Sequence, residues 1–420
     1  DTKRPLLPAG ITLIVVVLIF AGVYAQSPLY TSNQNQYFLH GLAKAGVGNL
    51  SHDWLANTLD PTPIFSLLVE YTERLYRSEL LFYVYYACLL GIYMYSVYGN
   101  IDNVFHLRGL RVKTVTFFSV FLLLHAAATR YILSSLISPD WAYLFEGGVA
   151  NQRVLGTVFQ PSTFGVLLIL SIYLFLRGRA YLAILSLGLA ASMHPTYLLS
   201  AGVLTATYMW ITYREEKRLA KTFGIGAFAL VLVLPILAYV YLSFVATPSE
   251  TSARAREILV NFRIPHHAVI SEWWNLTVLL DLIFITIALY LIRHTKLFTI
   301  MLTSMLVGTL LTLVQLFIQS DALALIFPWR ISVILVPLST SIIAAYLISA
   351  AVDRFSSRWV WFNQSVLVLS IFVIALLFIA GAYRMMVDFS LKYTSSDREM
   401  MSYVQQNKIM GDFYLVPTKM

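Results

Sequence analysis

Charged residues are scarce in this chain. Asp, Glu, Lys and Arg make up 12% of its 420 residues, whereas hydrophobic residues make up 59%, and the mean hydropathy is +0.73. A soluble domain cannot cover that much apolar surface with so few charges. The composition therefore predicts an all-α polytopic membrane protein.

Cysteine and the common catalytic motifs are also scarce. Cys88 is the only cysteine, which excludes an intrachain disulfide and a thiolate metal cluster. The sequence contains no Walker loop, dinucleotide fingerprint, HExxH or GxSxG motif, and its apolar runs lack the chain of acids that ion-coupled carriers usually carry. The net charge is +8, but the basic residues are dispersed over short loops, which argues against a nucleic-acid partner.

Long apolar runs recur along the chain and predict about eleven transmembrane helices in one membrane domain, residues 1–383. The runs cover residues 10–25, 79–99, 114–136, 160–176, 180–193, 196–213, 222–246, 275–292, 297–318, 331–350 and 360–383. Two of them, 160–176 and 180–193, are short for a perpendicular span, and the second ends at His194-Pro195, a predicted break between helices. For the first run, a cleavable signal peptide is the alternative.

Lysine and arginine predict the orientation. They concentrate in every second connection, which we therefore assign to the cytoplasm together with the amino terminus. The alternate, longer connections are expected on the non-cytoplasmic side, and they cover residues 26–78, 137–159, 247–274 and 319–330. The tail 384–420 follows them to that side, where residues 396–399 predict a helix start and residues 413–417 a short strand. We expect this tail to be the beginning of a truncated αβ domain.

The first long loop, 26–78, contains two acidic candidates. Its alternating apolar and polar clusters predict interfacial helices that lie on the membrane. On a continuous helix Asp53 and Asp60 would share a face, and Pro61 moves Asp60 out of helical geometry, so the two carboxylates could converge as a general base or metal-binding pair. The alternative is that Asp53 caps a helix and Asp60 initiates a proline turn.

Two basic residues are candidates for binding a phosphate. His194 lies where two short helices meet near the outer surface, and an imidazole there can hold a proton or bind phosphate. Arg153 is the strong cation of the second outer loop and could bind a phosphate through both of its terminal nitrogens. A capping histidine and a snorkelling interface anchor are the alternatives.

Two further outer segments give weaker signals. Trp329-Arg330 is typical of an aromatic belt with a headgroup contact. His266 and His267 are adjacent, so their side chains diverge and they rarely chelate one metal ion. Inside the apolar runs, a separate set of ionisable residues suggests either function or local pairing. That set consists of His125, Arg130 and Asp281.

The chain resembles the GT-C superfamily of integral-membrane glycosyltransferases, which take sugars from polyprenyl-phosphate carriers. The resemblance consists of the long acidic first outer loop, the His-Pro turn between short helices and the outer carboxyl tail. The runs 35–41, 53–58 and 60–65 also resemble a multispanning bacterial, largely cyanobacterial, family with no established activity. Both likenesses imply a multi-pass protein of the bacterial inner membrane.

By position, the GT-C resemblance implies a role for each candidate. Asp53 would be the general base that deprotonates the acceptor hydroxyl, with Asp60 assisting, and Arg153 and His194 would hold the lipid phosphate of a polyprenyl-phosphate-linked sugar. The further phosphate-binding candidates are Arg330 and His266. The first loop has no Asp-x-Asp or Glu-x-Asp pair, so no metal ligand is assigned and dependence on a divalent cation stays open.

Two other classes of function fit the same sequence. The chain could be a non-catalytic subunit whose outer loops dock a membrane protein partner within a larger complex. It could also be a lipid or oligosaccharide transporter, although the runs offer few polar residues to line a path across the membrane. Convergence of the acids with Arg153 would favour the enzyme.

Overall fold

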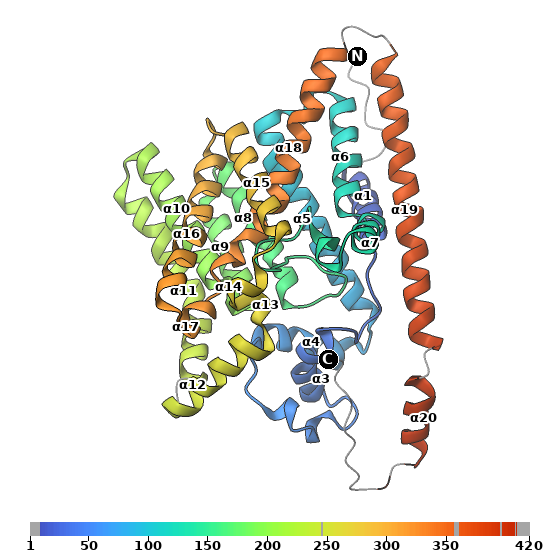
Figure 1. The fold of residues 1–420 in the computed structure, drawn as a ribbon, viewed down its shortest axis with the longest axis vertical. Helices are drawn as coiled ribbons and strands as arrows, with labels where there is room; N and C mark the ends of the chain where they lie inside the picture. Colours follow the sequence, from blue (N-terminus) through green and yellow to red (C-terminus); the bar gives the residue numbers. More distant parts are fainter. Residues whose placement is uncertain (1–8, 245–246, 357–360, 395–396, 408, 410–420) are drawn as a thin grey trace.

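The computed structural model describes residues 9–244, 247–356, 361–394, 397–407 and 409 (Figure 1). These residues form helices joined by turns and loops, and none of them lies in a β-strand. Helices satisfy backbone hydrogen bonds within one segment, as apolar surroundings require. The all-helical prediction is therefore confirmed for the described residues.

Five helices are long and apolar enough to cross a membrane. They are α5 (Leu80–Phe105), α11 (Leu219–Phe244), α16 (Lys296–Ile318), the segment Asp321–Phe355, most of which is α18 (Ser332–Phe355), and α19 (Phe362–Thr394). A sixth span results if α6 (Arg111–His125) and α7 (Ala127–Leu136), which meet at a bend of 46°, are counted together. This set of helices is compatible with a multi-pass membrane protein.

The remaining apolar runs also form helices, but these are shorter. They are α1 (Ala9–Tyr24), α8 (Val166–Leu176), α9 (Ala180–Met193) and α15 (Leu276–Leu291), together with the less apolar α10 (Leu198–Glu216). Sixteen helical residues extend about 24 Å, which is less than the roughly 30 Å of a hydrocarbon core. The described residues thus support five or six full spans, and the predicted count of eleven is not supported.

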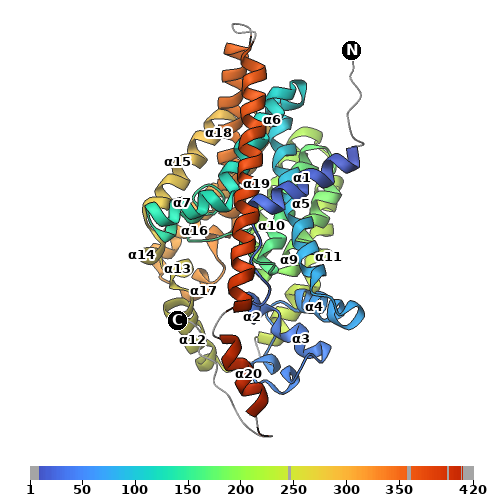
Figure 2. The same ribbon diagram turned by 90° about the vertical axis from the view of Figure 1, so that its right-hand side faces the viewer.

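Helix α18 lies at the centre of the bundle. In the apolar part of the segment Asp321–Phe355, which contains α18, the buried share is 78%, against 50% for α5, 11% for α11 and 17% for α19. A helix that is apolar all round and buried belongs to the core, whereas α11 and α19 present apolar faces outward, as lipid-facing helices do. Figure 1 shows α19 along one side of the molecule, and Figure 2, which faces that side, shows it running from top to bottom. There it packs on α1 and α6.

The two kinds of connection lie at opposite ends of the bundle. The carboxyl end of α18 lies at the top of Figure 1, and there Lys113 pairs with Asp353 at 2.7 Å. The short helices of the long connections lie toward the other end. They include α2 (Gln34–Tyr37), α3 (Leu39–Ala45), α4 (Pro63–Tyr76) and α12 (Ser249–Ile258), all labelled in Figure 2. We refer to this second end as the loop end; its assignment to the non-cytoplasmic side stays a prediction.

The predicted break at His194-Pro195 is confirmed. Helix α9 ends at Met193, the 3-10 turn η6 (Pro195–Tyr197) follows, and α10 begins at Leu198. In the tail, α19 continues past residue 383 to Thr394, and α20 (Asp397–Asn407) forms near the predicted helix start. The strand predicted at 413–417 lies outside the described residues.

Candidate functional site

Arg330 is a buried cation at the loop end, in the 3-10 turn η8 (Pro328–Ile331) that precedes α18. The residue is 8% exposed. Its Nη1 donates to Gln152 Oε1 at 2.5 Å, and its Nη2 donates to the Tyr197 hydroxyl at 3.1 Å. Its Nε is buried and has no hydrogen-bond partner in the described structure. The guanidinium is therefore held by neutral groups and has an unused donor.

Arg330 has no counter-ion among the described residues. No carboxylate pairs with it, nor with the neighbouring Arg153 and Arg263. A buried charge is costly unless an opposite charge or a full set of hydrogen bonds compensates it. The buried guanidinium thus lacks a compensating charge, and an anion bound beside it would supply one.

Other basic groups lie near Arg330. Arg153 and Arg330 both act to lower the pKa of His267, and Arg263 and Arg330 both act to lower the pKa of Tyr37. We call Arg153, Arg263 and Arg330, with His194 and His266, the arginine cluster. Burial lowers the pKa of His266, and Arg263 and Arg153 lower it further. To lower this pKa, the two arginines must lie close to His266, because the interaction between charges weakens with distance and is screened by salt. Because Arg153, Arg263 and His266 are exposed, an anion can approach the cluster from the molecular surface.

His194 joins the first loop to the arginine cluster. Its ring lies 6.1 Å from the ring of Tyr37 in α2. Burial lowers the pKa of His194, and Arg330 lowers it further, so the imidazole is neutral near pH 7. Nδ1 accepts the backbone N–H of Thr196 at 3.4 Å, which leaves the ring proton on Nε2 as a donor.

A strained turn brings the loop 137–159 to the cluster. Ala150 and Asn151 have φ angles of 60° and 53°, and Gly148 and Gln152 form an antiparallel bridge on either side. The left-handed conformation is unfavourable for alanine and persists where the surrounding structure imposes it. Here the carbonyl of Ala150 accepts from His267 Nδ1 at 2.7 Å. The turn thereby places Gln152 beside Arg330.

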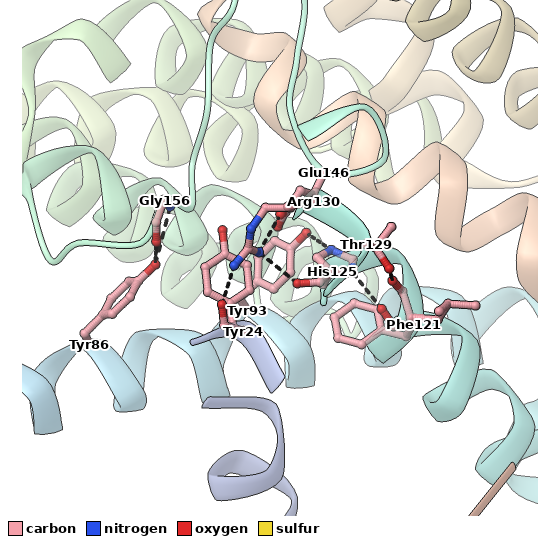
Figure 3. Close-up of polar contacts among 10 residues, drawn as sticks. Tyr24, Tyr86, Tyr93, Phe121, His125, Thr129, Arg130, Glu146 and Gly156 are labelled. Atoms are coloured by element: carbon pink, nitrogen blue, oxygen red, sulfur yellow. Dashed lines mark hydrogen bonds and ion pairs between the residues drawn. The ribbon is translucent and has the colours of Figure 1, made fainter. Parts of the chain in front are cut away.

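A second buried arginine anchors the other half of this loop (Figure 3). Arg130 in α7 donates through Nη1 to Glu146 at 3.1 Å and to the carbonyl of His125 at 2.9 Å. Its Nη2 donates to the carbonyl of Tyr24, the last residue of α1. Burial raises the pKa of Glu146, and the charge and hydrogen bond of Arg130 oppose that rise. Arg130 thus joins α1, the α6–α7 bend and the loop.

Two other ionisable residues of the apolar runs are also buried. His125 Nδ1 lies 2.8 Å from the carbonyl of Phe121, and Nε2 lies 2.8 Å from the Tyr93 hydroxyl. Asp281, in α15, is 5% exposed and has no ion-pair partner among the described residues. Of the three ionisable residues in the apolar runs, Arg130 forms an ion pair, with Glu146. This agrees with local pairing, one of the two alternatives given for that set.

The two acidic candidates make local contacts. Asp53 Oδ1 accepts the backbone N–H groups of Leu55 at 2.8 Å and Ala56 at 3.1 Å, which caps the following 3-10 turn η2 (Leu55–Asn57). The side chain is partly exposed. Nothing in the described structure joins it to Asp60 by a hydrogen bond or an ion pair.

Asp60 initiates the turn that leads into α4. It is 6% exposed, and its Oδ1 accepts from the backbone N–H of Thr62 at 2.9 Å. Lys44 Nζ lies 3.8 Å from Oδ2, and the Tyr239 hydroxyl donates to the Asp60 carbonyl at 2.7 Å. This is the local geometry of the proline-turn alternative.

The structure thus brings together the basic candidates and leaves the acidic ones apart. Arg153, His194, His266 and Arg330 all belong to the arginine cluster, whereas neither Asp53 nor Asp60 contacts it within the described part of the chain. Sequence reasoning did not select Arg263, although it lies close to His266 in the same loop. Among the described residues no group of three or more His, Cys, Asp or Glu side chains is placed to hold a metal ion.

Comparisons with models of known families, with curated proteins and with solved structures gave no match to this chain.

Proposed function

We propose that the arginine cluster binds the phosphate of a lipid carrier, and that the protein is a GT-C-like glycosyltransferase of the bacterial inner membrane. The sugar would move from a polyprenyl-phosphate carrier to an acceptor on the non-cytoplasmic face. The observation that carries the proposal is the buried guanidinium of Arg330, which has no carboxylate partner and an unused Nε donor. Arginine matches phosphate geometry through several parallel hydrogen bonds.

The cluster is chemically suited to a leaving phosphate. When the bond between the anomeric carbon and the phosphate breaks, negative charge increases on the phosphate oxygens. Fixed donors stabilise that charge without further reorganisation. Arg330 Nε and His194 Nε2 would supply buried donors, while Arg153 and Arg263 would attract the anion from the surface.

Asp53 is the proposed general base for the acceptor hydroxyl. Only Oδ1 accepts the capping hydrogen bonds, so Oδ2 is left to accept a proton. The partial exposure of the side chain gives an acceptor access to it. Asp60 would assist by holding the turn before α4, which helps to orient the first loop.

A non-catalytic membrane subunit is the second candidate. It is favoured by the local contacts of Asp53 and Asp60, because carboxylates used as a cap and in a turn need no catalytic role. In that case the arginine cluster would bind a phosphate-bearing lipid as a docking site and no sugar would be transferred.

Replacing Asp53 with Asn separates the two candidates. Asparagine caps a helix about as well as aspartate, so the fold should be retained, but an amide cannot accept the proton. We expect sugar transfer from a panel of polyprenyl-phosphate sugars to fall roughly 100-fold or more. The matched control is Asp140→Asn, at an exposed acid of the second outer loop, which should transfer sugar at the wild-type rate. Equal rates for wild type and Asp53→Asn would remove Asp53 from catalysis.

A further inference from the structure

We infer that the Arg130–Glu146 ion pair is a positioning device that sets the geometry of the arginine cluster from the far side of the second outer loop. The inference rests on the proposed function, because it concerns how the same phosphate site is held. Neither residue is placed to touch a ligand. Both are buried, at 7% and 4% exposure.

The ion pair fixes one half of the loop to three helices. Glu146 belongs to the loop, and Arg130 also donates to the last carbonyl of α1 and to a carbonyl at the α6–α7 bend. Figure 3 shows these bonds converging on one guanidinium. A bend between helices and a helix end are thereby tied to the loop at a single point.

The same loop supplies a group that holds the cluster, because Gln152 accepts from Arg330. The carbonyl of Ala150 accepts from His267, the sequence neighbour of the cluster residue His266. Between Glu146 and these residues lie few backbone bonds, and the turn at Ala150 is held in a left-handed conformation. A displacement of the backbone at Glu146 therefore also displaces Gln152, because the segment between them is short and its turn is conformationally restricted.

A tyrosine ring gives a second connection. The guanidinium of Arg153 lies over the ring of Tyr143 at 4.1 Å, and that of Arg130 lies 5.6 Å from the same ring. Cation–π contacts of this kind hold an arginine in place without a counter-ion. The Tyr143 ring thus lies between the positioning pair and an exposed arginine of the cluster.

The test is the affinity of the full-length protein, in detergent, for farnesyl phosphate as a short polyprenyl phosphate. Glu146→Gln removes the charge at nearly constant volume and should weaken binding roughly tenfold, as loss of supporting groups around a bound ion does. Glu146→Asp keeps the charge and should recover most of the affinity, which a merely space-filling role would not explain. The matched control is Asp353→Asn, which removes the exposed ion pair with Lys113 at the other end of the bundle and should bind as the wild type does.

Affinity within twofold of wild type for Glu146→Gln would overturn the inference. If that variant does not fold, Arg130→Lys replaces it. Lysine keeps the charge but cannot reach all three acceptors of Arg130. Weaker binding of farnesyl phosphate by this variant supports the inference, and unchanged binding contradicts it. A wild-type chain that does not bind farnesyl phosphate overturns the proposed function and this inference with it. The inference alone fails if the wild type binds farnesyl phosphate and Glu146→Gln binds it equally well. The proposed function fails if the wild type does not bind it.

Discussion

Replacing Arg330 with Ala is expected to lower the affinity for farnesyl phosphate about 100-fold. The guanidinium is buried, lacks a counter-ion and keeps Nε unused, so a bound phosphate would satisfy both its charge and its donor. Each hydrogen bond to a charged group contributes roughly 1.5–3 kcal/mol, and a tenfold change in affinity corresponds to about 1.4 kcal/mol. Equilibrium binding of the purified chain measures the effect.

Two variants make this result specific. Arg330→Lys keeps the positive charge but loses the planar fork, so it should bind more weakly than wild type and more tightly than Arg330→Ala. Arg254→Ala is the control, because Arg254 is an exposed arginine of the same end that already pairs with Glu257 at 2.7 Å. If the Arg330→Ala and Arg254→Ala variants bind farnesyl phosphate equally well, binding of the phosphate does not depend on the buried guanidinium.

The second large effect concerns the packing of α19 on α1. A Cβ at Gly381 would overlap the carbonyl oxygen of Gly22 and lie 2.9 Å from the Cα of Val23. Both neighbours are backbone atoms, so no side-chain rotation relieves the clash and the helices must separate. Gly381→Ala should therefore lower the free energy of unfolding by about 3 kcal/mol, at the upper end for overpacking. Unfolding in mixed detergent, followed by circular dichroism, measures the loss.

The control for this substitution is Gly202→Ala. Gly202 lies on an exposed face of α10, where a Cβ meets no atom within 4 Å. Alanine is the better helix former by about 0.8–1 kcal/mol, so this variant should be slightly more stable than wild type. Equal stability of the two variants would mean that α1 and α19 are not in close contact.

Much of the fold follows from hydropathy and from helix breakers. Apolar runs identify the helices because a helix satisfies its own backbone, and Pro195 ends the run before it. The described residues support five or six full spans where the sequence predicts eleven, because composition alone does not separate a short buried helix from one that crosses the membrane. Helix α8 is an example: it is as apolar as a span, but it ends at Leu176 before the turn at Gly178, where φ is +75°.

The basic half of the site could be predicted in part, and the acidic half only as alternatives. From the sequence, His194 and Arg153 are the main basic candidates and Arg330 is a weaker one, because each lies in a connection between apolar runs. Their convergence depends on pairing between loops that are far apart in the sequence, such as Gln152 with Arg330, and local patterns carry no information about such pairing. Asp53 was predicted either to cap a helix or to act as a base, and the capping bonds are present while its role as a base stays a proposal.

The measurement that tests the central claim most directly is a cryo-EM structure of the full-length protein with bound farnesyl phosphate. The account predicts density for the phosphate within hydrogen-bond distance of Arg330 Nε, with His194 and Arg153 beside it. A fully occupied ligand bound elsewhere, with the surroundings of Arg330 unchanged, would contradict the claim that the arginine cluster is the site of a lipid phosphate.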